Sequence, residues 1–234
     1  MLIKIVTLSS VLAFSMGQFI NGKCGKASIS FSGLSARVQC NYNHTAYPEH
    51  FSYENEVLKL TAYTDDLPHS INAGGLDPRT EMTFSDSYGF NQSDTAEFEA
   101  YVLVPSGIST PFSLFQVKCG DGIVGTATTG IMLNFKDGKF QRYDSSSTVP
   151  YYSNIYDQWI RFKVVFRGPS GKIDVYYGDT LSNKITYSQN GYANTYYFKI
   201  GPYGRELQNS VHNKMEAWFK NIKITKNGKD VTSA

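Results

Sequence analysis

The sequence has no long apolar run and no sustained helical period. Its longest apolar stretch, residues 5–14, is too short to span a bilayer, and no later segment approaches that length. Apolar and polar residues instead alternate over short runs that are separated by Gly, Asn, Asp, Ser or Pro. These absences argue against a helical bundle and against a membrane-bound protein.

An excess of charge of one sign and any metal-binding spacing are also missing. Lys and Arg number 22 against 20 Asp and Glu, so the net charge is only +2. No global field therefore favours nucleic acid or membrane, and a polyanion would have to bind a local cluster of charges. His44, His50 and His212 show no metal-ligand spacing, and no Asp-rich calcium loop is present. We expect no cofactor and no metal ligands, with a structural calcium ion left open.

The N-terminus has the pattern of a secretory signal. Lys4 precedes the apolar stretch, and small residues follow it at positions 15–17. We therefore expect residues 1–17 to be a signal peptide. Residues 18–234 contain no linker, charge block or repeat, which predicts a single domain. We expect the mature protein to be secreted and monomeric.

Cysteine is scarce, with three in the chain, so at most one intramolecular disulfide can form. Cys24 with Cys40 is the simplest pairing, and Cys40 with Cys119 stays open. Two Asn-x-Ser/Thr triplets, at Asn43 and Asn91, predict glycan acceptors in a eukaryotic host.

The alternating runs predict an all-β fold. Turn signals between them lie at residues 136–139, 168–171 and 226–229. Spacing of this kind is typical of a β-jelly roll, a concanavalin A-like sandwich of two antiparallel sheets in a single domain. The expected strands are residues 27–31, 57–62, 97–104, 113–118, 130–135, 159–166, 172–177, 196–200 and 216–225.

Three segments place cations, phenols and amides on one face of a strand and apolar residues on the other. Strand periodicity groups Arg79 with Glu81, and Gln116 with Lys118. The third segment is the most unusual, because it shows two phenols and two cations on one face. These are Tyr197, Lys199, Tyr203 and Arg205.

The three segments resemble the motif set of the β-jelly-roll polysaccharide lyases, namely the alginate lyases of the seventh lyase family and the related glucuronan lyases. Family members carry an Arg-x-Glu strand, a Gln-x-His strand and a Tyr-Phe-Lys-x-Gly-x-Tyr strand. This chain has corresponding residues at 79–81, 116–118 and 197–203, in the same order. The resemblance implies a secreted lyase that acts on a 4-linked uronate polymer by β-elimination.

Such a lyase must neutralise a carboxylate, supply a base and protonate the leaving oxygen. The resemblance implies that Arg79 and Gln116 neutralise the carboxylate and that Tyr203 is the catalytic phenol. Tyr203 could serve as the acid, and as the base if nearby cations such as Lys199 and Arg205 held its phenolate. Further substrate contacts are then expected from Lys199, Arg205, Glu81 and Tyr197.

The chain departs from the family at the Gln-x-His strand, where Lys118 replaces the His. Either Lys118 takes over part of that role, or a His comes from elsewhere, for which His69 is the better candidate. An upstream His resembles the layout of glucuronan lyases and favours a glucuronan-type substrate over alginate. Pro202 is a second departure, and it predicts an edge or a bulge at the site because it removes a ladder donor.

Two other functions compete with the lyase. A non-catalytic carbohydrate-binding lectin could use the same sandwich, since fold does not fix function. A glycoside hydrolase on a similar jelly roll would need a pair of carboxylates across the sugar, and no strand shows such a cluster. The sequence therefore favours the lyase, then the lectin.

Overall fold

The computed structural model of the chain describes residues 28–31, 34–40, 49–67, 77–84, 88–143, 152–204 and 213–232. These residues form two sheets of antiparallel strands. The first sheet runs in the order β1 (Ser28–Phe31), β2 (Leu34–Gln39), β5 (Glu81–Thr83), β14 (Tyr196–Tyr203), β7 (Phe112–Cys119), β8 (Thr129–Lys136), β9 (Lys139–Arg142) and β10 (Tyr152–Ser153).

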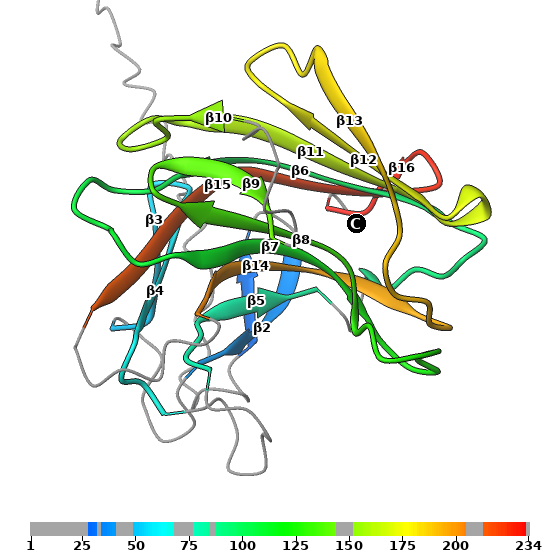
Figure 1. Cartoon of the computed structure of the whole chain (residues 1–234), viewed down its shortest axis with the longest axis horizontal. Coiled ribbons are helices and arrows are strands. Elements are labelled where there is room, and N and C mark those ends of the chain that lie inside the picture. The colour runs from blue at the N-terminus through cyan, green and yellow to red at the C-terminus, as the bar shows by residue number, and fades with distance from the viewer. Residues whose placement is uncertain are drawn as a thin grey trace, which may run out of the picture.

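The second sheet runs in the order β13 (Asn183–Ser188), β12 (Lys172–Tyr177), β11 (Ile160–Arg167), β6 (Thr95–Leu103), β15 (Lys214–Lys226), β4 (Val57–Tyr63) and β3 (Phe51–Glu54), and β16 (Lys229–Asp230) pairs with β15. Figure 1 shows the sheets as stacked layers, with β11, β12 and β6 above and β7, β14 and β5 below. The predicted all-β sandwich of two antiparallel sheets is confirmed.

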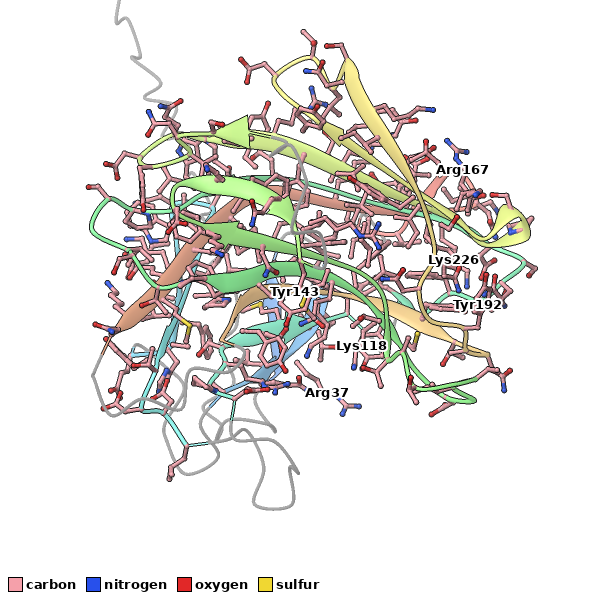
Figure 2. The ribbon with its side chains drawn as sticks, in the orientation of Figure 1. Arg37, Lys118, Tyr143, Arg167, Tyr192 and Lys226 are labelled. Atoms are coloured by element: carbon pink, nitrogen blue, oxygen red, sulfur yellow. The ribbon has the colours of Figure 1, made fainter. Side chains whose placement is uncertain are left out.

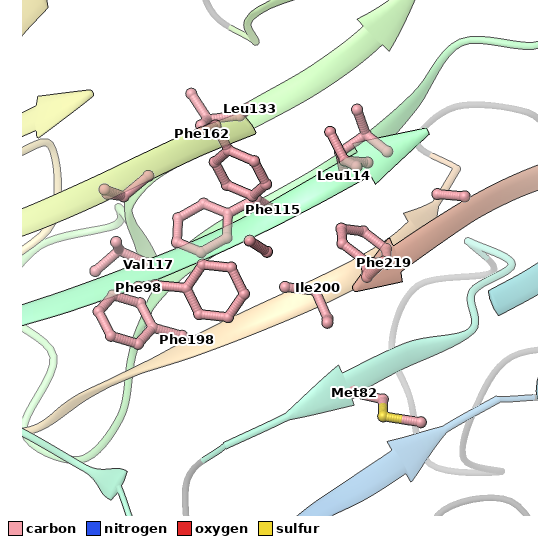
Figure 3. Packing of buried hydrophobic residues seen from close by; sticks show 14 of the residues in the cluster. Met82, Phe98, Leu114, Phe115, Val117, Leu133, Phe162, Phe198, Ile200 and Phe219 are labelled. Carbon is pink, nitrogen blue, oxygen red and sulfur yellow. The ribbon is translucent and has the colours of Figure 1, made fainter. Parts of the chain in front are cut away.

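Aromatic residues from both sheets fill the space between the layers. Phe98 of β6 lies 5.0 Å from Phe115 of β7 and 5.7 Å from Phe198 of β14, measured between ring centroids. Figure 3 shows these rings packed together with Phe162 of β11. Since successive strand residues point to opposite faces, burying Phe115 and Phe198 turns Gln116 and Lys199 to the outer face of the first sheet.

The expected strands are all present, with ends that differ by at most three residues. The sequence analysis did not predict β2, β3, β9, β10, β13 and β16. Of these, β3, β9, β10 and β16 are short and β13 is mostly exposed, whereas β2 alternates clearly between buried and exposed residues. The turn signals were correct. Asp137 and Gly138 have φ values of 52° and 70° between β8 and β9, and Asn227 and Gly228 have 52° and 75° between β15 and β16.

In the part of the chain that the structure describes, the named helical segment is a short 3-10 turn at Gly168–Ser170. No helix in these ranges is long and apolar enough to cross a membrane. The predicted signal peptide, residues 1–17, lies outside the described residues and stays a prediction.

Candidate functional site

The three sequence segments become neighbouring strands. β14 pairs with β5 on one side and with β7 on the other, and Lys199 of β14 is in register with both Thr83 of β5 and Gln116 of β7. Residues more than a hundred positions apart therefore meet at the centre of the first sheet. We call the outer surface of these strands the polar face, and it comprises Arg79, Glu81, Gln116, Lys118, Lys199 and Tyr203.

The predicted division of each strand into two faces is correct for the described residues. Met82, Phe198 and Ile200 are fully buried in the core between the sheets. Lys118 and Tyr197 face each other in register on the outer side and keep partial exposure. Figure 2 shows Lys118 below the strands of this sheet, on the side turned away from the second sheet.

Glu81 lies at the centre of a buried polar cluster. Its Oε2 atom is 2.5 Å from Lys199 Nζ and 3.6 Å from an Arg79 terminal nitrogen, while Gln116 Nε2 donates a hydrogen bond to Oε1. Glu81 is 1% exposed, and Lys199 and Gln116 are 3% exposed each. Burial lowers the pKa of Lys199, and the nearby Glu81 carboxylate opposes that shift. The cluster fixes the side chains of Lys199 and Gln116, while Arg79, whose side chain is 14% exposed, lies at its edge.

Tyr203 is placed by a bulge in β14. The register between β14 and β7 shifts between Ile200 and Tyr203, which confirms the bulge that Pro202 predicted. Gly201 has φ +116°, and a Cβ atom there would lie 2.3 Å from the Thr80 carbonyl oxygen. Only glycine fits this backbone, because the neighbouring strand approaches too closely for any side chain.

The phenol of Tyr203 is held by two residues of the segment that precedes β5. Its hydroxyl donates a hydrogen bond of 2.7 Å to Asp77 Oδ2, and the Arg79 guanidinium lies over its ring, 4.2 Å from the centroid. Burial and the Asp77 hydrogen bond raise the pKa of Tyr203 to about 12, against the smaller opposing effect of Arg79. Among the described residues these effects favour the protonated phenol, and the alternative that Lys199 and Arg205 hold its phenolate stays a prediction, because Arg205 lies outside those residues. Tyr203 is a neutral hydrogen-bond donor, suited to an acid.

The pKa of Lys118 is shifted in the opposite direction. Burial, followed by repulsion from Lys199, lowers its pKa to about 8, while Glu81 acts against this shift. A lysine with this pKa is partly neutral in mildly alkaline water and can accept a proton. Tyr197, opposite Lys118, has a pKa raised by burial, and Arg37 of β2 opposes that shift.

Several predicted residues fall outside the described ranges. These are His69, Arg205, Cys24 and Asn43, and their predicted roles remain predictions. His50 is described and is fully buried, with its Nδ1 atom 3.2 Å from the Thr61 carbonyl oxygen. It lies beside Thr80, whose buried side chain alternates with Arg79 and Glu81, so His50 does not belong to the polar face.

The remaining modification sites are only partly described. Cys119 is a free, buried cysteine, which excludes the Cys40–Cys119 pairing and leaves Cys24–Cys40 as the prediction. Asn91 is exposed in a turn, where its Oδ1 atom accepts hydrogen bonds from the Ser93 backbone and hydroxyl. That exposure is compatible with the predicted glycan. Among the described residues, no group of three or more His, Cys, Asp or Glu is placed to hold a metal ion.

The sequence analysis missed Asp77. The signal was present in the sequence, because Asp77 lies two residues before Arg79 and four before Glu81, on the same strand face. Asp77 could be recognised as part of the site only after its hydrogen bond to Tyr203 was seen, more than a hundred residues along the chain.

Comparison with known proteins gives one relative by sequence and several by fold. The chain is 31% identical to the citrate-binding protein of Hevea brasiliensis over 179 residues, which are 76% of this chain and 68% of that protein. No family model matches the sequence.

Similar solved structures include alginate lyases. AlgAT5 of polysaccharide lyase family 7 has a TM-score of 0.61 at 18% identity, covering 81% of this chain and 93% of that one. An alginate lyase from Corynebacterium sp. has a TM-score of 0.58 at 16% identity, covering 90% and 92%. A third, the family 7 lyase A1-II′ in complex with a substrate, has a TM-score of 0.56 at 14% identity, covering 77% and 82%. At these identities the likeness establishes the jelly-roll fold.

Proposed function

The chain belongs to the family of the Hevea brasiliensis citrate-binding protein, and we propose that its polar face binds a 4-linked uronate polymer and cleaves it by β-elimination. The observation that carries this proposal is that one face holds a lysine with a lowered pKa and a tyrosine with a raised pKa. Lys118 has a pKa of about 8 and Tyr203 a pKa of about 12. Titratable groups displaced in opposite directions are the pattern expected of a base and an acid.

Carboxylate recognition is the first task of the proposed site. The C-5 proton of a uronate is weakly acidic while the neighbouring carboxylate keeps its charge, so that charge must be offset. Arg79 supplies a guanidinium at the edge of the buried cluster, and Gln116 is held beside it through Glu81. Their fixed positions reduce the reorganisation needed when negative charge develops on the substrate.

The proposed reaction moves two protons. The neutral amine of Lys118 takes the C-5 proton, and the electron pair left on C-5 forms the C-4 to C-5 double bond as the bond from C-4 to the glycosidic oxygen breaks. Tyr203 donates its phenolic proton to that oxygen, which becomes the anomeric hydroxyl of the neighbouring sugar. Water returns a proton to the Tyr203 phenolate and removes one from the Lys118 ammonium, so the enzyme is restored.

Support for a uronate polymer comes from three observations. The structures of similar fold are alginate lyases, one of them with its substrate bound. The substitution of Lys118 for the family His favours a glucuronan-type chain over alginate, with His69 as an alternative base. The predicted signal peptide fits an extracellular polymer as substrate.

A second candidate is carboxylate binding without cleavage. It is favoured by the citrate-binding relative and by the loss of the Gln-x-His histidine. The same cations would then bind citrate, or bind an acidic sugar if the protein is a lectin. Both candidates use Arg79, but only the lyase needs the proton donor Tyr203.

The deciding experiment follows the ultraviolet absorbance of the unsaturated product with polyglucuronate, alginate and a heparin-like polymer at pH 9. We expect cleavage of at least one polymer by the wild-type protein. In Tyr203→Phe we expect a loss of about 100-fold or more with binding retained. Tyr101→Phe, a phenol of the second sheet, is the matched control. Absence of product from every polymer, with citrate bound in a calorimeter, would instead establish the second candidate.

A further inference from the structure

The carboxylate of Asp77 has no role in the elimination described so far, although it makes the hydrogen bond that holds the Tyr203 phenol. The two oxygen atoms lie 2.7 Å apart, and both residues are half-buried. A phenol that donates to a carboxylate has a fixed hydroxyl direction, because the donor hydrogen must point at the acceptor.

The backbone delivers Asp77 to this position. The Gly204 amide donates to the Pro78 carbonyl over 3.0 Å, and the Thr80 amide donates to the Pro202 carbonyl over 2.9 Å. Arg79 forms a β-bridge with Tyr203 between these two bonds. The contact is therefore built into the strand pairing and does not depend on an exposed side chain finding its partner.

The charged groups that act on Tyr203 come from one side of its strand. The segment before and within β5 supplies Asp77, Arg79 and Glu81, of which both carboxylates raise the pKa of the phenol and Arg79 lowers it. On the other side, β7 places the uncharged Ser113 opposite Tyr203. Asp77 is the negative group in direct contact with the hydroxyl.

We propose that Asp77 is a positioning residue that orients the Tyr203 hydroxyl and holds it in the neutral, proton-donating form. The proposal deepens the proposed elimination and rests on it for its meaning. When Tyr203 gives its proton to the leaving oxygen, the new phenolate lies beside the Asp77 carboxylate. Repulsion between two adjacent negative charges then favours rapid return of a proton from water.

Asp77 also sets the width of the active pH range. The proposed base works when Lys118 is neutral, above about pH 8, and the acid works when Tyr203 is protonated, below about pH 12. Without the charge of Asp77 the phenol would ionise at lower pH, so the upper limit would fall while the lower limit stayed in place.

The test measures ionisation of Tyr203 directly, without substrate. In protein labelled with carbon-13 at the tyrosine ζ position, the Tyr203 signal is the one missing from Tyr203→Phe. We expect Asp77→Asn to lower the pH at which this signal titrates by about one unit. Asp77→Glu should keep it near the wild-type value, and Asp179→Asn, an exposed carboxylate between β12 and β13, should leave it unchanged.

Failure of this inference and failure of the proposed function give different results. An unchanged Tyr203 titration in a folded Asp77→Asn protein would overturn the role of Asp77, whatever the activity. If the titration shifts but the wild-type protein cleaves no uronate polymer, Asp77 controls the phenol and the lyase assignment is wrong. With an active enzyme, we expect Asp77→Asn to lower kcat more than it changes KM, and to move only the alkaline limb of the pH profile.

Discussion

Lys199 and Glu81 form an ion pair of 2.5 Å between two neighbouring strands, with both side chains almost fully buried. Such a pair contributes little net stability, because desolvation offsets most of the attraction. Removing one partner is costly, since the other charge is then left in a poorly solvated place. The pair therefore fixes the geometry of the polar face, and its members respond strongly to single substitutions.

We expect Lys199→Met to lower the free energy of unfolding by about 3 kcal/mol, because Glu81 loses its closest cation. Lys163→Met breaks the more exposed pair with Glu97 and should cost less than about 1 kcal/mol. Urea unfolding measures both. The double variant Glu81→Gln/Lys199→Met should recover much of the loss, and a double variant as unstable as the single one would contradict the explanation.

Gly201 provides a second stability test. We expect Gly201→Ala to cost about 3 kcal/mol or more, because the added Cβ atom would overlap the Thr80 carbonyl oxygen as well as strain the backbone. Gly228 has a positive φ of +75°, but nothing lies within 4 Å of the position that a Cβ atom would take there. Gly228→Ala should therefore cost only about 1 kcal/mol. Equal losses in thermal or urea unfolding would show that the close strand approach is unimportant.

The pH profile of cleavage tests the proposed base. Wild-type activity should rise as Lys118 loses its proton, with half of the maximum near pH 8. In Lys118→His the acid limb should move toward about pH 6.5, the ordinary value of an imidazole. Lys118→Arg should be inactive over the whole range, because a guanidinium keeps its proton. An acid limb that stays in place in Lys118→His would return the base role to His69 or another group.

Lys118 should also reduce stability at neutral pH. Its pKa is lowered from 10.5 to about 8, so below pH 8 the folded state carries a charge that it disfavours. Between about pH 8 and 10.5 the unfolded chain binds more protons than the folded one, and stability contributed by this group rises with pH.

We therefore expect Lys118→Met to be more stable than wild type at pH 7, by about 1 kcal/mol after allowing for solvent exposure. The advantage should shrink as the pH rises from 8 toward 10.5. Unfolding by urea across this range measures the difference. A constant difference at every pH would mean that packing, and not charge, separates the two proteins.

The sequence predicted most of the strands that carry a clear alternation and the division of each into two faces. It also predicted the bulge at Pro202, because a missing amide proton is a local property of one residue. The short strands β3, β9, β10 and β16 and the exposed β13 were missed because their local pattern is weak, and β2 was missed although its residues alternate in burial. The sequence did not predict which strands pair with each other, because strand pairing depends on contacts between residues far apart in the chain.

The sequence by itself determined which residue types stand on each strand face, and so the presence of Arg79, Gln116, Lys199 and Tyr203 with their aromatic, core-facing neighbours. The tertiary structure decided their charge states. It buried Lys199 against Glu81, brought Asp77 to the Tyr203 hydroxyl and placed Lys118 near other cations. A pKa depends on burial and on the distances to neighbouring charges, and both are set only when the two sheets and their strands have packed.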